Sequence, residues 1–189
     1  MKIFSATIAL IMLVLSTNAY ARTLPKAPIA TNCHAKASQV WQAGNKKLLI
    51  EAFAEGPNCK KAIVTLVIRN SSGTPIWYDV STVSDNMVLS ENPSANSVAM
   101  GKILKNWIMI DNSQRPSDSL PEWKANSQAP EAEEFPFYPS ETISRDEYTM
   151  LRNSKLPMFC FVTGMESSTC LVLKTDGTIT DIGTQTFPG

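Results

Sequence analysis

The chain has 189 residues, in which 17 Lys and Arg balance 17 Asp and Glu, with one His and four Cys. The zero net charge argues against a protein that binds nucleic acid or an anionic membrane surface through its electrostatic field. One His excludes a metal site built from several histidines of one chain. A composition of 43% hydrophobic and 18% charged residues excludes wholesale disorder.

Residues 1–21 have the pattern of a secretory signal peptide. Lys2 supplies a positive start, Ile3–Leu15 form an apolar run, and Ala19-Tyr20-Ala21 places small residues where signal peptidase requires them. The apolar run is shorter than the roughly 20 residues that span a bilayer. We therefore expect cleavage after Ala21 and export to the periplasm or the medium. A single mature α+β domain, 22–189, would remain, without a membrane span.

All four cysteines follow this segment, so in an oxidising compartment we expect them to form two disulfides. Gly44-Asn45 separates two strand-like runs and favours a tight hairpin between them. Pairing Ala43 with Lys46 across that turn brings Cys33 close to Cys59. The sequence therefore predicts a Cys33–Cys59 bond that closes the open end of the hairpin.

A second hairpin is expected near the C-terminus, where residues 158–163 and 169–174 flank a short turn. Asp176-Gly177 then forms a tight turn into a further strand, 178–182. The hairpin register places Cys160 opposite Cys170, which favours a cross-strand disulfide. We prefer these two local pairings to bonds that join the halves of the chain, because both close without rearranging a hairpin.

The middle of the chain predicts two more strands and two helices. Ala62–Arg69 is almost continuously apolar, so we expect a strand buried on both faces, followed by a strand over Pro75–Ser81. The apolar spacing in Ser94–Ile108 predicts an amphipathic helix, opened by Asn92-Pro93. A capping box beginning at Ser144 predicts a short helix that ends before the next proline.

The fold class that follows is α+β. We expect one antiparallel sheet of about seven strands, with one amphipathic helix packed on it, a short second helix and a long Pro-rich loop. That loop, residues 113–140, has no helical or strand period and is long for a compact domain, which is typical of a functional or partly disordered segment.

The loop also supplies the candidate binding residues, because it gathers aromatic and acidic side chains. These candidates are Trp123, Glu131, Glu133, Glu134, Phe135, Phe137 and Tyr138. Aromatic groups with a polar rim are typical of binding patches. The alternative, which we favour, is that the aromatic and proline residues pack back over the sheet as a lid on the core.

Catalytic chemistry finds little support in the sequence. His34 neighbours Cys33, but adjacent residues on a strand face opposite sides, so we expect an exposed or capping histidine and no catalytic residue. No motif for a cofactor or a metal ion is present, and none is expected. The alternative is an exported hydrolase of cell-wall or sugar polymers, with an acid/base pair among the loop carboxylates.

An exported, disulfide-bonded, β-rich chain is similar in general character to periplasmic inhibitors of lysozyme. Those inhibitors insert a Ser-Gly-x-x-Tyr loop into the enzyme, and Ser72-Gly73 begins such a pattern here. Ile76 occupies the place of the tyrosine, so this chain departs from it. We therefore expect an exported, non-catalytic binding or inhibitor-like protein, whose partner is an envelope protein or a small-molecule ligand. A third alternative is an envelope protein whose exposed sheet edge accepts a partner strand.

Overall fold

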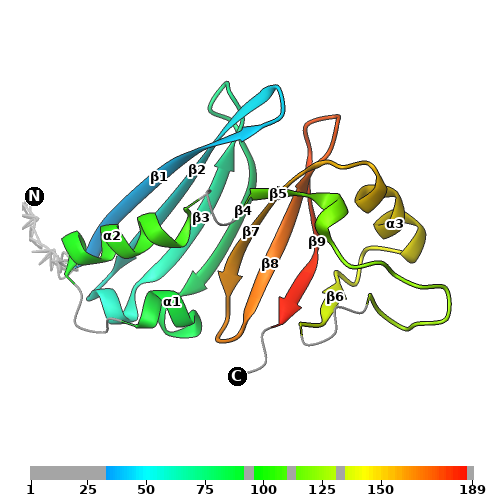
Figure 1. The fold of residues 1–189 in the computed structure, drawn as a ribbon. Coiled ribbons are helices and arrows are strands. Elements are labelled where there is room, and N and C mark those ends of the chain that lie inside the picture. The colour runs from blue at the N-terminus through cyan, green and yellow to red at the C-terminus, as the bar shows by residue number, and fades with distance from the viewer. Residues whose placement is uncertain (1–32, 92–95, 110–113, 131–134, 187–189) are drawn as a thin grey trace, which may run out of the picture.

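The computed structural model describes residues 33–91, 96–109, 114–130 and 135–186, and shows two antiparallel sheets with helices at their margins (Figure 1). The predicted signal peptide and the three glutamates of the Pro-rich loop, Glu131, Glu133 and Glu134, lie outside the described residues. No helix of the described part is long and apolar enough to cross a membrane.

The first sheet is a four-stranded meander in the order β1-β2-β3-β4. Its strands are β1 (Cys33–Ala43), β2 (Lys46–Gly56), β3 (Ile63–Arg69) and β4 (Pro75–Thr82). The first hairpin turns at Gly44, whose φ of +64° suits glycine, and pairs Ala43 with Lys46 as predicted. The predicted hairpin and the two predicted strands that follow it are confirmed, and together they form this meander.

The second sheet has the order β5-β7-β8-β9-β6. Its strands are β5 (Gln114–Pro116), β6 (Phe137–Pro139), β7 (Pro157–Thr163), β8 (Ser167–Leu173) and β9 (Ile179–Thr186). The prediction of one sheet of about seven strands is therefore wrong. Two three-residue strands from the Pro-rich loop add to the edges of the C-terminal strands, and within the described residues no ladder joins these strands to the meander.

The helices begin where polar side chains cap them. They are α1 (Met87–Ser90), α2 (Ser97–Trp107) and α3 (Arg145–Asn153). Asn96 accepts a hydrogen bond from the Ala99 N–H, so α2 begins at Ser97 and not at the predicted Ser94, while Asn92-Pro93 lies outside the described residues. Short 3₁₀ turns occupy Cys59–Lys61, Val83–Asp85 and Ser117–Ser119.

Two hydrophobic cores share the strands β7 and β8. Phe159, Phe161 and Leu171 face the meander and α2 in the larger core, where Phe159 contacts Trp41 with ring centroids 5.8 Å apart. The alternate residues Met158, Cys160, Cys170 and Val172 face the other way and pack in the smaller core with α3. Figure 1 shows β7–β9 between the meander and α3. Each face of this central hairpin is therefore buried by a different layer.

Both predicted disulfides are present. Cys33 and Cys59 are bonded with Cα atoms 4.8 Å apart, and Cys160 and Cys170, which are directly paired across β7 and β8, are bonded with Cα atoms 4.1 Å apart. Each bond joins residues of the same sheet or of its connecting turn. The cross-links therefore hold each half of the molecule separately.

The outer face of the meander is less buried than the sequence indicates. Ile63 is 54% exposed, so β3 is not buried on both faces as predicted. The difference arises because α2 and the second sheet cover only the inner face. In the middle of the outer face, Glu51 forms ion pairs with Lys36 and Arg69, both at 2.7 Å. These two cations hold the pKa of the Glu51 carboxyl below its usual range.

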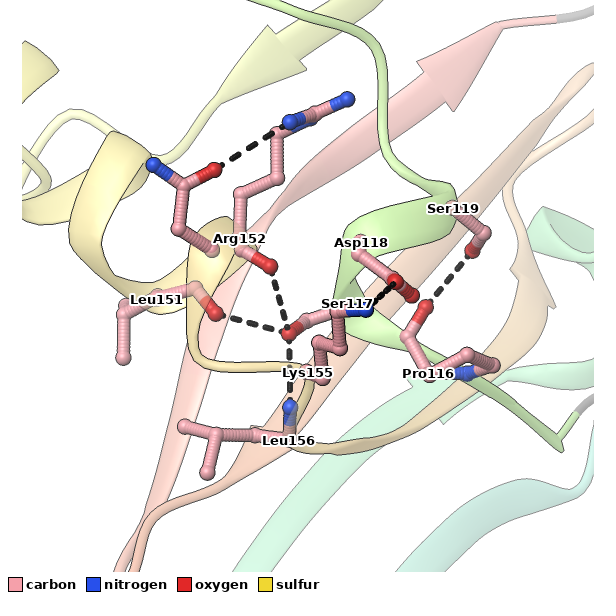
Figure 2. Close-up of polar contacts among 9 residues, drawn as sticks. Pro116, Ser117, Asp118, Ser119, Leu151, Arg152, Lys155 and Leu156 are labelled. Atoms are coloured by element: carbon pink, nitrogen blue, oxygen red, sulfur yellow. Dashed lines mark hydrogen bonds and ion pairs between the residues drawn. The ribbon is translucent and has the colours of Figure 1, made fainter.

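A buried serine joins the Pro-rich loop to the end of α3 (Figure 2). The Ser117 hydroxyl accepts a hydrogen bond from the Leu156 N–H at 2.9 Å and donates to the Leu151 carbonyl at 2.7 Å. The Ser117 N–H in turn donates to the Leu156 carbonyl. This side chain is fully buried and satisfies a carbonyl that the last helical turn leaves open.

We expect Ser117→Ala to lower the free energy of unfolding by about 2 kcal/mol, because the buried Leu151 carbonyl would lose its donor and the Leu156 N–H its side-chain acceptor. Ser119→Ala is a matched control in the same turn. The Ser119 hydroxyl is exposed, so its loss should cost less than about 0.5 kcal/mol. Urea unfolding of both variants tests the difference, and equal losses would contradict a structural role for Ser117.

Candidate functional site

The described candidate residues from the Pro-rich loop fall into two groups. Trp123 and Phe137 belong to the smaller core, where both contact the Tyr148 ring, with centroids 5.6 and 5.9 Å away. The Trp123 indole also donates to the Ser127 carbonyl at 3.1 Å. Phe135 and Tyr138 are instead 40% and 54% exposed. The loop thus lies as a lid over the smaller core, with two aromatic side chains left at the surface.

Phe135 lines a cavity of about 510 Å³ beside β7. Arg115 supplies the positive charge of this cavity, and its guanidinium donates to the Gln185 side chain at 3.2 Å. The remaining walls are largely apolar, with Trp107 and Met109 among them. The cavity therefore offers one guanidinium group, which already has a partner.

A second cavity, of about 350 Å³, lies between the two sheets and is called the inter-sheet cleft here. Strand alternation places Trp77, Asp79 and Ser81 on the inner face of β4, where all three line the cleft. The opposite wall comes from β7, β8 and β9. Its strand residues are Phe161, Thr163, Thr169 and Asp181, and Asp85, Asn86, Trp107 and Gly164 complete the lining.

The charged residues that line the inter-sheet cleft are all negative. Three of its lining residues are aspartates, Asp79, Asp85 and Asp181, and none is Lys, Arg or His. Asp85 accepts a hydrogen bond from the Thr82 hydroxyl at 2.8 Å. Within the described part of the chain, Asp79 has no hydrogen bond or ion pair. The cleft is therefore a region of negative potential without a counter-charge.

Asp181 is the most perturbed of these carboxyls. Burial raises its pKa above the usual range, and the negative charge of Asp79 raises it further. The Gly183 N–H, which donates to Asp181 at 2.9 Å, opposes both effects. A partly buried acid with a raised pKa beside a second acid in a cleft is a recognised mark of a functional site.

Aromatic rings form one wall of the cleft. The Phe161 ring meets Trp77 and Trp107 edge to face, with centroids 5.7 and 5.8 Å apart. Trp107 is fixed by a hydrogen bond from its indole to the Val162 carbonyl at 2.8 Å, and Asn86 donates to the same oxygen at 2.7 Å. The wall is thus rigid before any ligand enters.

This arrangement suits a cationic organic group better than a metal ion. Aromatic faces attract an ammonium or guanidinium group through their quadrupole, and carboxylates supply charge-assisted hydrogen bonds. In the ranges that the structure describes, no three His, Cys, Asp or Glu side chains are placed to hold a metal ion together. The hydroxyl groups of Thr163 and Thr169, 2.9 Å apart, add hydrogen-bonding capacity.

Sequence reasoning missed this site because its residues come from distant strands. Trp77 was identified only as a strand residue, and Asp181 only as part of a hairpin. One signal was present: Trp77 and Asp79 are two apart, so a strand places the acid on the same face as the aromatic residue. His34, by contrast, lies where predicted, with its side chain 77% exposed and paired with Glu55 at 2.6 Å.

Comparisons with protein families, with curated proteins and with solved structures found no match to this chain. Function is therefore inferred from the geometry of the cleft. Its negative charge, aromatic wall and enclosed volume are the features from which that inference begins.

Proposed function

We propose that this is an exported, non-catalytic binding protein whose inter-sheet cleft holds an organic cation. The observation that carries the proposal is the lining of the cleft, which combines three aspartates and three aromatic rings with no basic residue. Such a site offers an ammonium group both charge neutralisation and contact with aromatic faces.

Two further features support an exported binding protein. Both disulfides are of the kind that persists in an oxidising compartment, which is compatible with export. The aromatic wall is held by the Trp107 and Asn86 hydrogen bonds, and such preorganisation reduces the conformational entropy that the site loses when a ligand binds.

The charge of the ligand can be tested with matched small molecules. A quaternary ammonium, a primary amine, a neutral isostere and a carboxylate of the same size would be titrated into the protein by calorimetry. We expect only the two cations to bind. Asp79→Asn should weaken their binding about tenfold or more, since it removes a charged partner. Asp146→Asn, which removes a charge from the distant helix α3, is the matched control.

We expect cation binding to weaken as the pH falls through the raised pKa of Asp181. The reason is that the protonated carboxyl, which burial favours, must lose its proton before it can neutralise a cation. Affinity should therefore be highest above that pKa and should lose up to tenfold per pH unit below it. Calorimetry at several pH values measures this slope. In Asp181→Asn the part of the slope due to this proton should vanish, and an unchanged slope would contradict the assignment.

The exported hydrolase is the second candidate, and the pair Asp79 and Asp181 is the observation that favours it. A glycoside-cleaving site also uses a pair of carboxyls. The three glutamates first considered for this role lie outside the described residues, so the described candidates are these aspartates. Release of reducing ends from cell-wall polymers, abolished by Asp181→Asn, would favour the hydrolase over the binding protein.

A further inference from the structure

The two edge strands of the four-stranded meander, β1 and β4, differ in how far they are covered and charged. Helix α2 covers the β1 edge: the His34 N–H donates to the Ser97 hydroxyl at 3.0 Å, and Gly101 brings the helix close to the Lys36 carbonyl. The β1 edge also carries a charge, since Lys36 forms an ion pair with Glu51, and the His34 side chain contacts Glu55. Covering and charge are the usual protections of a sheet edge.

The β4 edge has neither protection. In the part of the chain that the structure describes, β4 pairs only with β3. Among the described residues, no backbone hydrogen bond fills the other side of this strand. Its eight residues carry one charge, Asp79, which faces the inter-sheet cleft, and its outward-facing Tyr78 and Val80 are 70% and 55% exposed. A long, nearly uncharged edge of this kind is a template for another strand.

One face of the second sheet lies beside the unpaired edge of β4 and presents a row of side chains. Cross-strand pairing places Phe161, Thr169, Thr184 and Tyr138 in one row across β7, β8, β9 and β6. The row begins under the meander, where Phe161 contacts Trp77 of β4. It ends at Tyr138, which is 54% exposed, whereas the neighbouring Phe137 is buried on the opposite face. The second sheet thus extends to an exposed edge strip at β6, called the ledge here, which carries the Tyr138 ring.

We propose that the cation bound by the cleft is a Lys or Arg side chain of an extended polypeptide, which adds to β4 as a fifth strand above the ledge that ends at Tyr138. This inference rests on the proposed function and names its ligand. Charge complementarity selects the occupant, because a strand paired with β4 places every second side chain on the cleft side, opposite Asp79. A basic residue there faces Asp79, Asp85 and Asp181, with no competing base in the lining.

The remaining side chains of such a strand have partners of different chemistry. Those that alternate with the basic residue lie on the outer face, beside Tyr78 and Val80, so small apolar residues suit them. The open backbone groups of β4 supply affinity that does not depend on sequence, and the cleft supplies the selection for a basic residue. The protein would therefore recognise an extended basic segment and not a folded surface.

The test uses the full chain and the labelled peptide Ac-Val-Thr-Val-Lys-Val-Thr-Val-NH₂, followed by fluorescence anisotropy. Replacing its Lys by Gln should weaken binding at least tenfold, and Asp79→Asn in the protein should do the same. Two further peptides carry N-methyl groups on alternate residues, in the two possible phases. A strand uses only every second N–H toward its neighbour, so one phase should bind and the other should lose binding at least tenfold.

Substitutions in the protein test where the peptide binds. Tyr78→Ala should weaken the peptide several-fold, because Tyr78 flanks the added strand on the outer face of β4, and should leave a simple amine unaffected. Met150→Ala, at an exposed residue of α3, should change neither. If the amine binds and both N-methylated phases bind like the parent peptide, strand addition is wrong and the cation site stands. If neither amine nor peptide binds, both proposals fail. A β4-mediated dimer in light scattering would also overturn the inference, because the occupant would then be a second copy.

Discussion

Gly183→Ala should lower the free energy of unfolding by about 3 kcal/mol or more, from backbone strain together with a clash that cannot relax. Gly183 has a φ of +142°, and a Cβ atom there would lie 2.3 Å from the Tyr138 carbonyl oxygen and 2.7 Å from Pro139 Cα. Both contacts are with backbone, so only displacement of β6 can relieve them. Because Phe137 on β6 fills the smaller core, that displacement would also expose apolar surface.

Gly73→Ala measures the cost of backbone strain alone, without a steric clash. Gly73 also has a positive φ, +83°, but nothing lies within 4 Å of the Cβ position. Its replacement should therefore cost only the conformational strain, about 1 kcal/mol. Chemical denaturation of both variants gives the comparison. Equal losses would mean that β6 is not held against β9 as described.

Removal of the Cys33–Cys59 bond should have the second large effect. The chain-entropy relation gives about 3.6 kcal/mol for the loop that this bond closes, with a sequence separation of 26 residues. Both cysteines are buried in the larger core, so alanine at both positions retains an apolar environment. We expect the double alanine variant to show this loss in urea unfolding.

The other disulfide provides the internal comparison. Cys160 and Cys170 are only 10 residues apart, and the same relation gives about 2.8 kcal/mol. Circular dichroism should therefore show a lower urea midpoint for the Cys33/Cys59 variant than for the Cys160/Cys170 variant. The reverse order would indicate that chain entropy does not govern these two bonds.

Local signals account for the parts of the fold that the sequence predicted well. The turn at Gly44-Asn45 determines the register of the first hairpin, and that register brings Cys33 within reach of Cys59. Likewise the capping residue Ser144 accepts a hydrogen bond from the Glu147 N–H, and α3 spans Arg145–Asn153 as expected. Each of these depends on residues close together in the chain.

The division into two sheets and the inter-sheet cleft depend on residues that are far apart in the chain. Periodicity along the sequence does not show which of these residues come together. β5 and β6 have three residues each, too few for a period, and their positions come from ladders with β7 and β9. Asp79 and Asp181 lie on strands of different sheets and meet only when the sheets pack. The loop aromatics were recognised, but sequence could not separate the buried Phe137 from the exposed Tyr138 without the β6–β9 register.

The central hairpin of β7 and β8 makes the sequence intolerant of length changes at one place. Insertion or deletion of a single residue before Phe159 would exchange the two faces of β7. Phe161 would then leave the aromatic wall of the cleft, and Cys160 would leave its bonded partner. A single residue gained or lost there would disrupt both cores, whereas the exposed turn residues Met165 and Glu166, between the two strands, can accept an added residue.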